Sequence, residues 1–432
     1  MDRTNKSITS ITVLLLFAGL PFTASAAPYV QCPADALPFG DGNGRIDASE
    51  VAAFDADAAN PLSPNFGRNV KCMHISAGDG FVKMADDAAK LQYVFSFSDL
   101  TTTSTAATSI LDGTLAANVP APSIILEQDQ EFYLTLTNVG MANRPDLSDP
   151  HTVHFHGFPQ ASAIFDGVPD ATISVNMGAS LTYYYNVVEP GTYMYHCHVE
   201  ATEHMQMGML GNLYVHAGQD KVAVGTPLGS YFHTAGDRYA YNDGDGSTVY
   251  QVEAAIQLAS FDPVFHDASM NTQPLPFAGM KDTYAMLNGR GYPDTVNPGA
   301  LVPPPETGGK VTQKVSAFVE ANVGQKILLR LSNLNVTNYY TLTALGLDMR
   351  VVGKGARQLK GSDGIDLSYY TKSVTLGGGE AWDVIIDTTG VAPGTYFLYT
   401  TNMNFLSNNT EDYGGMMTEI FISPPSAPSP VI

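Results

Sequence analysis

The feature that most constrains the fold of this chain is an internal repeat. The segment PGTY at residues 190–193 recurs at 393–396, and GMLGNLYV at 208–215 lines up with GMMTEIFI at 415–422. Similar segments that recur in the same order indicate a duplicated structural unit. The sequence therefore predicts two consecutive domains of similar build.

Within each repeat, short runs rich in β-branched and aromatic residues follow one another. SIILEQDQEFYLTLTN (123–138), LTYYYNVV (181–188) and KILLRLSN (326–333) are examples, and glycine, proline, asparagine and aspartate separate such runs. This spacing is typical of a β-sandwich or barrel, while helical periodicity is weak. We therefore expect an all-β protein with two tandem domains. The expected boundaries are 27–72 for an N-terminal arm, 73–217 for the first domain, 218–283 for a connector and 284–425 for the second domain.

An export signal is predicted at the N-terminus. Arg3 and Lys6 precede the apolar run ITVLLLFAGL (11–20), and Ala-Ser-Ala at 24–26 fits a signal-peptidase site. The apolar run is too short to favour a membrane span. We therefore expect a signal peptide over residues 1–26 and a periplasmic or secreted protein without a membrane span.

The net charge and the cysteines agree with that location. A formal charge of −21 argues against nucleic acid and anionic lipid as partners, and it suits a protein that attracts cations. In an oxidising compartment, Cys32 and Cys72 are expected to form a disulfide that ties the arm to the first domain. The alternative is two free thiols. Cys197 is left over, between two histidines.

Two segments of the first predicted domain concentrate metal-ligating side chains. They are HTVHFHG (151–157) and YHCHVEATEHMQMGM (195–209). Because side chains on a strand alternate between its two faces, each segment presents ligands on both faces. One face collects His151 and Cys197. The other face collects His154, His156, His196 and His198.

The first of these two sets has the ligand types of an electron-transfer copper site. Such a site combines a cysteine thiolate, two imidazoles and a weak axial thioether. His204 supplies the second imidazole in this prediction. Met209 supplies the thioether, because it follows a glycine and lines up with Met416 of the repeat. The alternative is a buried free cysteine beside packed histidines.

The second set offers four imidazoles and no carboxylate or thiolate. This donor set suits copper better than calcium or magnesium. Cys197 lies directly between His196 and His198, so three consecutive residues would connect the two metal sites as an electron path. The alternative is four ordinary surface histidines.

The second repeat lacks these ligands. Its positions aligned with the histidines of HTVHFHG hold Tyr340, Thr343 and Leu345, and its positions aligned with His-Cys-His hold the residues YTT at 399–401. We therefore expect the second domain to have a structural or assembly role.

These motifs resemble those of the multicopper oxidases, which are built from cupredoxin domains. HTVHFHG is similar to their His-x-x-His-x-His-Gly motif, and HCHVEATEHMQMGM is similar to their His-Cys-His motif with its later histidine and methionine. The resemblance implies two tandem cupredoxin-like Greek-key domains, each a β-barrel or sandwich, and a copper-dependent oxidoreductase. In such an enzyme, electrons from a small-molecule or metal-ion donor pass through Cys197 to a copper cluster that reduces dioxygen.

The resemblance also implies a role for each site residue. Type 1 copper would be held by His151, Cys197, His204 and Met209. His154 would face a type 2 copper, and His156, His196 and His198 would face a type 3 pair. Asp166 and Glu200 match acidic positions that pass protons to bound oxygen, a step that dioxygen reduction requires. The alternative for Asp166 and Glu200 is an ordinary loop carboxylate.

The chain departs from the family in one respect. The family's cluster takes twice as many histidines, from two different domains, while this chain offers only one set of four. A symmetric homo-oligomer would supply the same set twice, because a two-fold interface repeats each contact. We therefore expect a cluster shared between two copies of the chain.

Two other functions remain open from the sequence. Copper nitrite reductases also place type 1 copper and part of a type 2 site in their first domain, but they have an aspartate where this chain has His154. A non-catalytic blue copper carrier or copper-binding protein would leave His154, His156 and His198 without a role.

A weaker signal lies in the N-terminal arm. FGDGNGRIDASE (39–50) resembles an EF-hand calcium loop, with Asp41, Asn43 and Glu50 at ligand positions. Phe39 occupies the first ligand position, so calcium binding is expected to be weak or absent. The alternative is a capped turn that leads into a helix.

Overall fold

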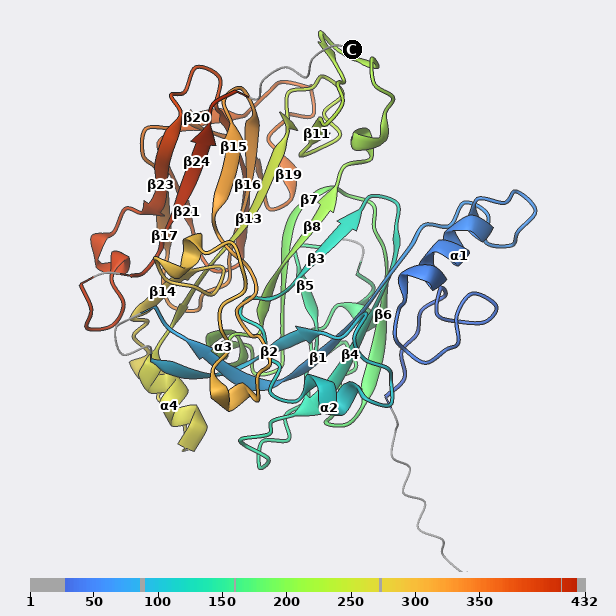
Figure 1. Cartoon of the computed structure of the whole chain (residues 1–432), viewed down its shortest axis with the longest axis vertical. Helices are drawn as coiled ribbons and strands as arrows, with labels where there is room; N and C mark the ends of the chain where they lie inside the picture. Colours follow the sequence, from blue (N-terminus) through green and yellow to red (C-terminus); the bar gives the residue numbers. More distant parts are fainter. Residues whose placement is uncertain (1–27, 86–89, 159–160, 272–273, 413, 426–432) are drawn as a thin grey trace, which may run out of the picture.

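The computed structural model describes residues 28–85, 90–158, 161–271, 274–412 and 414–425. The predicted signal peptide lies outside these residues. Figure 1 shows two β-domains side by side and an N-terminal arm that projects from the first domain, on the side away from the second. The all-β class with two tandem domains is confirmed. None of the helices in the described part of the chain is long and apolar enough to cross a membrane.

The first domain is a sandwich of two four-stranded sheets. One sheet has the order β2 (Leu91–Asp99), β1 (Val70–Lys83), β4 (Glu131–Gly140) and β6 (Ser180–Asn186). The other has the order β3 (Ala121–Glu127), β8 (Leu210–His216), β7 (Gly191–His196) and β5 (His154–His156). Two short helices, α2 (Ser109–Gly113) and α3 (Ala201–Met207), lie in the connections.

The second domain repeats this two-sheet plan. Its larger sheet contains β14 (Tyr284–Leu287), β13 (Val252–Phe261), β16 (Lys326–Asn333), β22 (Glu380–Asp387), β18 (Met349–Lys354), β19 (Arg357–Gln358) and β20 (Tyr369–Thr371). Its smaller sheet contains β15 (Val319–Asn322), β24 (Met417–Ser423), β23 (Gly394–Thr400), β17 (Tyr340–Ala344) and β21 (Ser373–Leu376).

The sheet of the second domain begins earlier in the chain than the repeat predicts. β13 lies within the range 218–283, which the sequence predicts to be a connector. It nevertheless pairs in parallel with β16, as β1 pairs with β4 in the first domain. β13 and β1 therefore take the same position in their sheets, although their residues do not match. The rest of that range holds β9 (Pro227–Leu228), β10 (Tyr231–Phe232), β11 (Arg238–Tyr239), β12 (Val249–Tyr250) and α4 (Pro263–Asn271).

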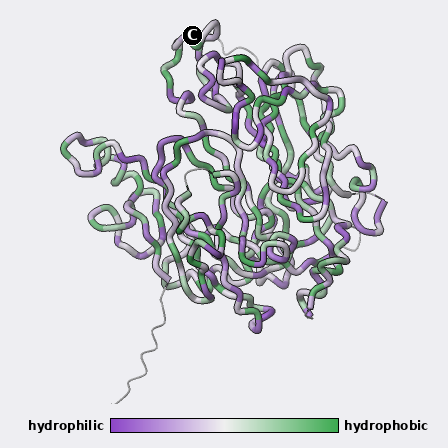
Figure 2. Tube along the Cα trace, turned by 180° about the vertical axis from the view of Figure 1, so that it is seen from behind, coloured by the Kyte–Doolittle hydropathy of each residue, from purple (hydrophilic) through white to green (hydrophobic). Residues whose placement is uncertain are grey.

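Each domain encloses its own apolar core, and a third cluster joins the two domains. In this interdomain cluster, Met194 and Leu210 of the first domain pack with Phe261, Met286 and Leu334 of the second. Burial of such side chains contributes on the order of 2 kcal/mol each. In Figure 2, hydrophobic and hydrophilic residues follow one another at short intervals along the trace.

A buried ion network also holds the domains together. The guanidinium of Arg330, on β16, lies 2.6 Å from a carboxylate oxygen of Glu253 and 3.5 Å from one of Asp383. It also donates to the hydroxyl of Thr192, on β7, at 3.1 Å. Because β7 leads directly into Cys197, this network fixes the strand that carries the predicted metal ligands.

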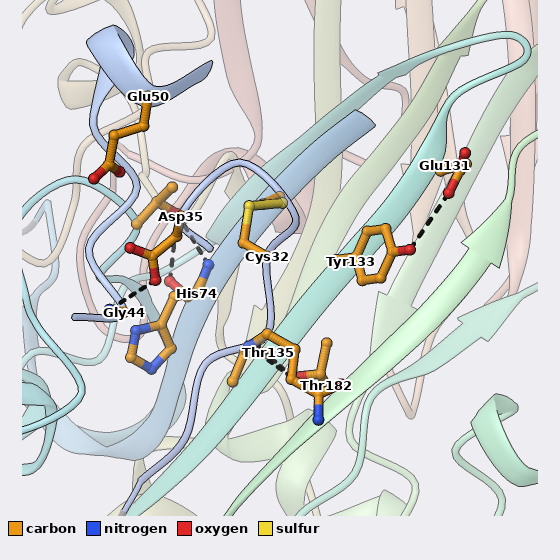
Figure 3. Close-up of a disulfide and its surroundings, with 12 residues drawn as sticks. Cys32, Asp35, Gly44, Glu50, His74, Glu131, Tyr133, Thr135 and Thr182 are labelled. Carbon is orange, nitrogen blue, oxygen red and sulfur yellow. Dashed lines mark hydrogen bonds between the residues drawn. A yellow bond between two sulfur atoms is a disulfide. The ribbon is translucent and has the colours of Figure 1, made fainter. Parts of the chain in front are cut away.

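The N-terminal arm is attached covalently to the first domain. The predicted disulfide between Cys32 and Cys72 is confirmed, and it links the arm to β1 (Figure 3). The helix α1 (Ala48–Ala58) begins with a capping box, in which the carboxylate of Glu50 accepts from the backbone N–H of Asp47 at 3.1 Å. Phe54 packs into a small apolar cluster around the disulfide.

Candidate metal centres

The predicted metal ligands of the first domain lie on and beside two paired strands. β5 pairs antiparallel with β7, which places His154 opposite His196. His151 precedes β5 and Cys197 follows β7, and both side chains turn into the interior of the sandwich, where neither is exposed. The side chains therefore form two groups. We call His151, Cys197, His204 and Met209 the inner set, and His154, His156, His196 and His198 the outer set.

The two imidazoles of the inner set converge on the cysteine sulfur. Nδ1 of His204 lies 3.2 Å from Sγ of Cys197, and Nδ1 of His151 lies 3.7 Å from the same atom. The short helix α3 supplies His204, and the backbone N–H of Met209 donates to the carbonyl of His204 at 2.8 Å. All four side chains are fully buried. Two imidazoles and a thiol within 4.8 Å of one another form a donor set that fits copper.

Burial sets the protonation state of this inner set. Desolvation lowers the pKa of His204 to about 4 and that of His151 well below its ordinary value, so both imidazoles are neutral at pH 7. Burial also raises the pKa of the Cys197 thiol to about 11. A bound cation would reverse that shift, because it stabilises the thiolate.

The outer set forms a second cluster of imidazoles. The ring centre of His154 lies 5.2 Å from that of His196, 5.1 Å from that of His198 and 6.0 Å from that of His156. The rings of His196 and His198 stack at 5.5 Å. His196 is buried, and the other three are partly exposed.

Backbone carbonyls orient two rings of the outer set. Nδ1 of His154 donates to the carbonyl of Asp166 at 2.5 Å, and Nδ1 of His196 donates to the carbonyl of Cys197 at 2.8 Å. These bonds leave Nε2 of each ring as the acceptor atom that can hold a metal ion. Burial lowers the pKa of His196 to about 3, so its ring is neutral and able to coordinate.

A pocket of about 360 Å³ separates the outer set from the second domain. His156 and His196 line one wall, and the segment 334–339 between β16 and β17 lines the other. At Gly379, in the turn before β22, a Cβ atom would lie 3.0 Å from Cε1 of His156, so glycine leaves room for the ring. No histidine of the described second domain lines this pocket.

The two predicted proton-transfer residues lie at different sites. Asp166 lies beside the outer set, with a carboxylate oxygen 3.7 Å from Nδ1 of His154. Glu200 lies beside the inner set, where its carboxylate is grouped with that of Asp149 and a ring nitrogen of His204. The position of Asp166 fits proton transfer at the outer set. Glu200 lies instead next to His204 of the inner set.

Sequence reasoning missed Asp149 and Glu203, which also lie near His204. Burial, together with repulsion from Glu200 and Asp149, raises the pKa of Glu203 to about 7. Burial is also the main cause that raises the pKa of Asp149. A signal was present for Asp149, which lies two residues before His151, but proximity to His204 depends on how the loop folds.

The structure groups a third acidic residue with the two acidic residues of the predicted calcium loop. Asp41 and Glu50 lie together with Asp35, which the sequence did not single out. Asp35 accepts from the backbone N–H groups of Gly42 and Gly44 at 3.1 and 2.9 Å (Figure 3). The side-chain oxygen of Asn43 accepts from the N–H of Arg45, and its amide donates to the carboxylate of Asp41. These contacts close the loop, and calcium binding stays a prediction.

Comparison with known proteins finds similarity to multicopper oxidases in the first domain. Residues 102–220 match the family model described as multicopper oxidase, and this range contains both metal-binding motifs. Over 86 residues, the chain is 34% identical to multicopper oxidase MmcO of Mycobacterium tuberculosis. That match covers 20% of this chain and only 16% of the relative.

Solved structures share the fold over both domains. The blue copper oxidase of Nitrosomonas europaea aligns with a TM-score of 0.57 and 20% identity, covering 82% of this chain and 86% of that one. A copper nitrite reductase of the same organism aligns with a TM-score of 0.52 and 16% identity, covering 82% and 94%. The expected cupredoxin-like fold is confirmed.

Proposed function

We propose that this chain is a copper-dependent oxidoreductase of the multicopper oxidase type, which takes single electrons from a donor and delivers them to dioxygen. The observation that carries the proposal is the arrangement of the two sets of ligands. Cys197 belongs to the inner set, and its two sequence neighbours, His196 and His198, belong to the outer set. Copper bound to these sets would supply one-electron redox chemistry.

The two sets of ligands have different roles in this proposal. The buried inner set excludes water and holds its donors in place before a metal ion arrives, which favours rapid electron transfer. The backbone from His196 to His198 is the covalent connection between the sets. Asp166, next to His154, is positioned to deliver protons where the acceptor is reduced.

The outer set needs a second copy of the chain to complete a family-type cluster. His154 and His198 are partly exposed, so a partner's ring can approach them. Next to Asp166, the apolar side chains of Ile164 and Ile173 are about half exposed, at 47% and 51%. A two-fold dimer would bury this apolar surface and bring two outer sets together. Such a dimer would hold about five copper ions, two in the inner sets and three shared.

The same outer set also fits a type 2 copper site that reduces nitrite. The pocket beside His156 and His196 has a volume of about 360 Å³, which admits a small anion. However, in nitrite reduction His154 would have to serve as the acid–base group. This is the second candidate function.

A single copper-loaded sample tests these functions together. We expect an intense visible band from the Cys197 thiolate, and oxygen consumption when a phenolic donor is added. Nitrite reduction without oxygen consumption would favour the second candidate, and reduction of neither acceptor would indicate an electron carrier. Cys197→Ser should remove the visible band while the outer set keeps its copper. A visible band that survives this substitution would refute the assignment of the inner set.

Mass and copper content test the shared cluster. We expect a copper-loaded dimer with more than two copper ions per chain pair, and loss of the excess copper when dimerisation is blocked by Ile164→Asp. A monomer that reduces oxygen at full rate would refute the shared site.

A further inference from the structure

Two ligands of the inner set lie on one short segment, residues 204–209, which we call the ligand loop. The loop begins in α3 with His204 and ends at Met209, just past the end of the helix. α3 has only seven residues, and a helix this short is marginal in the absence of tertiary contacts. The positions of His204 and Met209 therefore depend on what packs against the ligand loop.

Gln206, in the middle of the ligand loop, is held from outside the first domain. Its side-chain amide donates to Oδ1 of Asp282, just before β14, at 2.8 Å. Among the described residues, the amide oxygen of Gln206 finds no hydrogen-bond partner, so the bond to Asp282 fixes the orientation of the side chain. The backbone carbonyl oxygen of Gln206 lies 3.0 Å from Nε2 of His266, on α4.

Asp282 is a buried carboxylate that joins three separate segments. Besides the amide of Gln206, the hydroxyl of Ser260, on β13, donates to Oδ2 at 2.5 Å, and the hydroxyl of Thr337 donates to the same oxygen. A buried carboxylate is unfavourable unless hydrogen bonds satisfy it, and bonds to a charged acceptor are stronger than neutral ones. Asp282 therefore holds the ligand loop, β13 and the segment around Thr337 together.

Thr337 connects this carboxylate to the outer set. It belongs to the segment 334–339 that lines the pocket beside His156 and His196. Its hydroxyl oxygen also accepts from the side-chain amide of Asn338 at 3.0 Å. The wall of that pocket and the ligand loop thus share one hydrogen-bond network, which runs through the second domain and is separate from the covalent path along residues 196–198.

We propose that Asp282 is a positioning residue of the inner site, which fixes His204 and Met209 through Gln206 and connects their position to the pocket wall through Thr337. The properties of such a copper site depend on its axial ligand and on the groups that orient the other ligands. The second domain, which lacks the metal ligands, would in this way tune a metal site that it does not contain. This inference rests on the part of the proposed function that assigns copper to the inner set.

Hydrogen exchange in the copper-free full chain tests the positioning without any metal. Asp282→Ala should speed amide exchange of residues 204–209 by about tenfold or more, the effect of losing one hydrogen bond to a charged group. Asp282→Asn keeps a side-chain oxygen that can accept from Gln206, and it should restore slow exchange. Unchanged exchange of the ligand loop in Asp282→Ala, or faster exchange spread evenly over the second domain, would overturn the proposal.

The copper-loaded protein then reports on the ligand geometry. Asp282→Ala should shift the reduction potential and the EPR hyperfine splitting of the inner copper, and should speed its loss to a chelator by about tenfold or more. Asp282→Asn should return all three toward the unaltered protein. An unchanged potential and splitting would overturn the positioning role while the copper assignment stands. An unaltered chain without a visible band would overturn the proposed function, and the exchange experiment would still decide the positioning.

A pair of threonine variants tests the connection to the pocket wall. Thr337→Val keeps the side-chain shape and removes the hydroxyl that donates to Asp282. The matched control is Thr341→Val in the same domain, because the hydroxyl of Thr341 bonds instead to that of Thr375 at 2.8 Å. The EPR splitting of the inner copper should shift only in Thr337→Val, and this substitution should add no shift in a chain that already carries Gln206→Leu.

The second comparison separates the network from a direct effect of the pocket on the outer set. Gln206→Leu already breaks the network, so a pocket effect that bypasses Asp282 would persist in that background. Equal shifts in the two threonine variants, or a full additional shift on top of Gln206→Leu, would refute the connection through Thr337.

Discussion

Replacing Arg330 with methionine should destabilise the second domain by an amount that the structure allows us to work out. The side chain of Arg330 is completely buried, 2.6 Å from Glu253 and 3.5 Å from Asp383. With an effective dielectric constant of about 20, these two distances correspond to about 6 and about 5 kcal/mol of attraction. Desolvation of the three ions costs several kcal/mol each and offsets most of this gain.

The net effect follows from what the substitution leaves behind. Glu253 keeps its contact with His216 at 2.9 Å, and Asp383 keeps the hydroxyl donors of Thr192 and Tyr241, each at 2.5 Å. The two carboxylates nevertheless lose their buried counter-charge. Breaking a buried pair in this way costs about 3–5 kcal/mol. We expect Arg330→Met to lower the free energy of unfolding of the second domain by that amount.

Urea unfolding followed by fluorescence measures this loss directly. Trp382 is the single tryptophan of the chain and lies next to Asp383, so its signal reports on the second domain. The control is Arg357→Met, because the side chain of Arg357 is 62% exposed, and its pair with the partly exposed Glu189 is worth about 1 kcal/mol or less.

The pH dependence provides the sharper test. In this variant Glu253 keeps its burial, which raises its pKa, and loses the guanidinium charge that lowers it. A raised carboxylate pKa means that the folded variant binds protons more readily, so the destabilisation should shrink as the pH falls from 8 to 5. A loss below about 1 kcal/mol, or one that does not change with pH, would refute the reasoning.

Three further predictions concern other parts of the molecule. Gly379→Leu adds a Cβ atom 3.0 Å from Cε1 of His156 and should displace that ring. The copper content of the outer set should fall while the visible band stays the same, and unchanged copper content would contradict this prediction. Removing the disulfide with Cys32→Ala and Cys72→Ala should cost about 4 kcal/mol for a 40-residue separation, measured by urea unfolding against the oxidised wild type. Burial opposes ionisation of Glu253, but its hydrogen bond with histidine and the nearby arginine lower its pKa from 4.5 to about 2. Its contribution, on the order of 3 kcal/mol, is complete above about pH 5 and is lost as the pH falls toward 2; Glu253→Gln should remove this part of the acid dependence.

Much of the fold was readable from local patterns. Alternating apolar runs predicted strands, and the recurrence of PGTY predicted two domains. The sequence did not predict where the second domain starts. β13 matches β1 in its pairing but not in its residues. Strand pairing depends on backbone hydrogen bonds that many sequences can make. Two strands with the same pairing therefore need not show a sequence repeat.

The sequence by itself determined which side chains share a face. His154 and His156 lie on one face, and Cys197 lies between two histidines, because side-chain alternation is a property of a single strand. Only the tertiary structure decided that Glu200 lies with Asp149 next to His204, and that the described residues of the second domain place no histidine in the pocket beside the outer set. These contacts join residues that are far apart in the chain, and they depend on loop conformation and on how two sheets pack. No local period in the sequence encodes either of these.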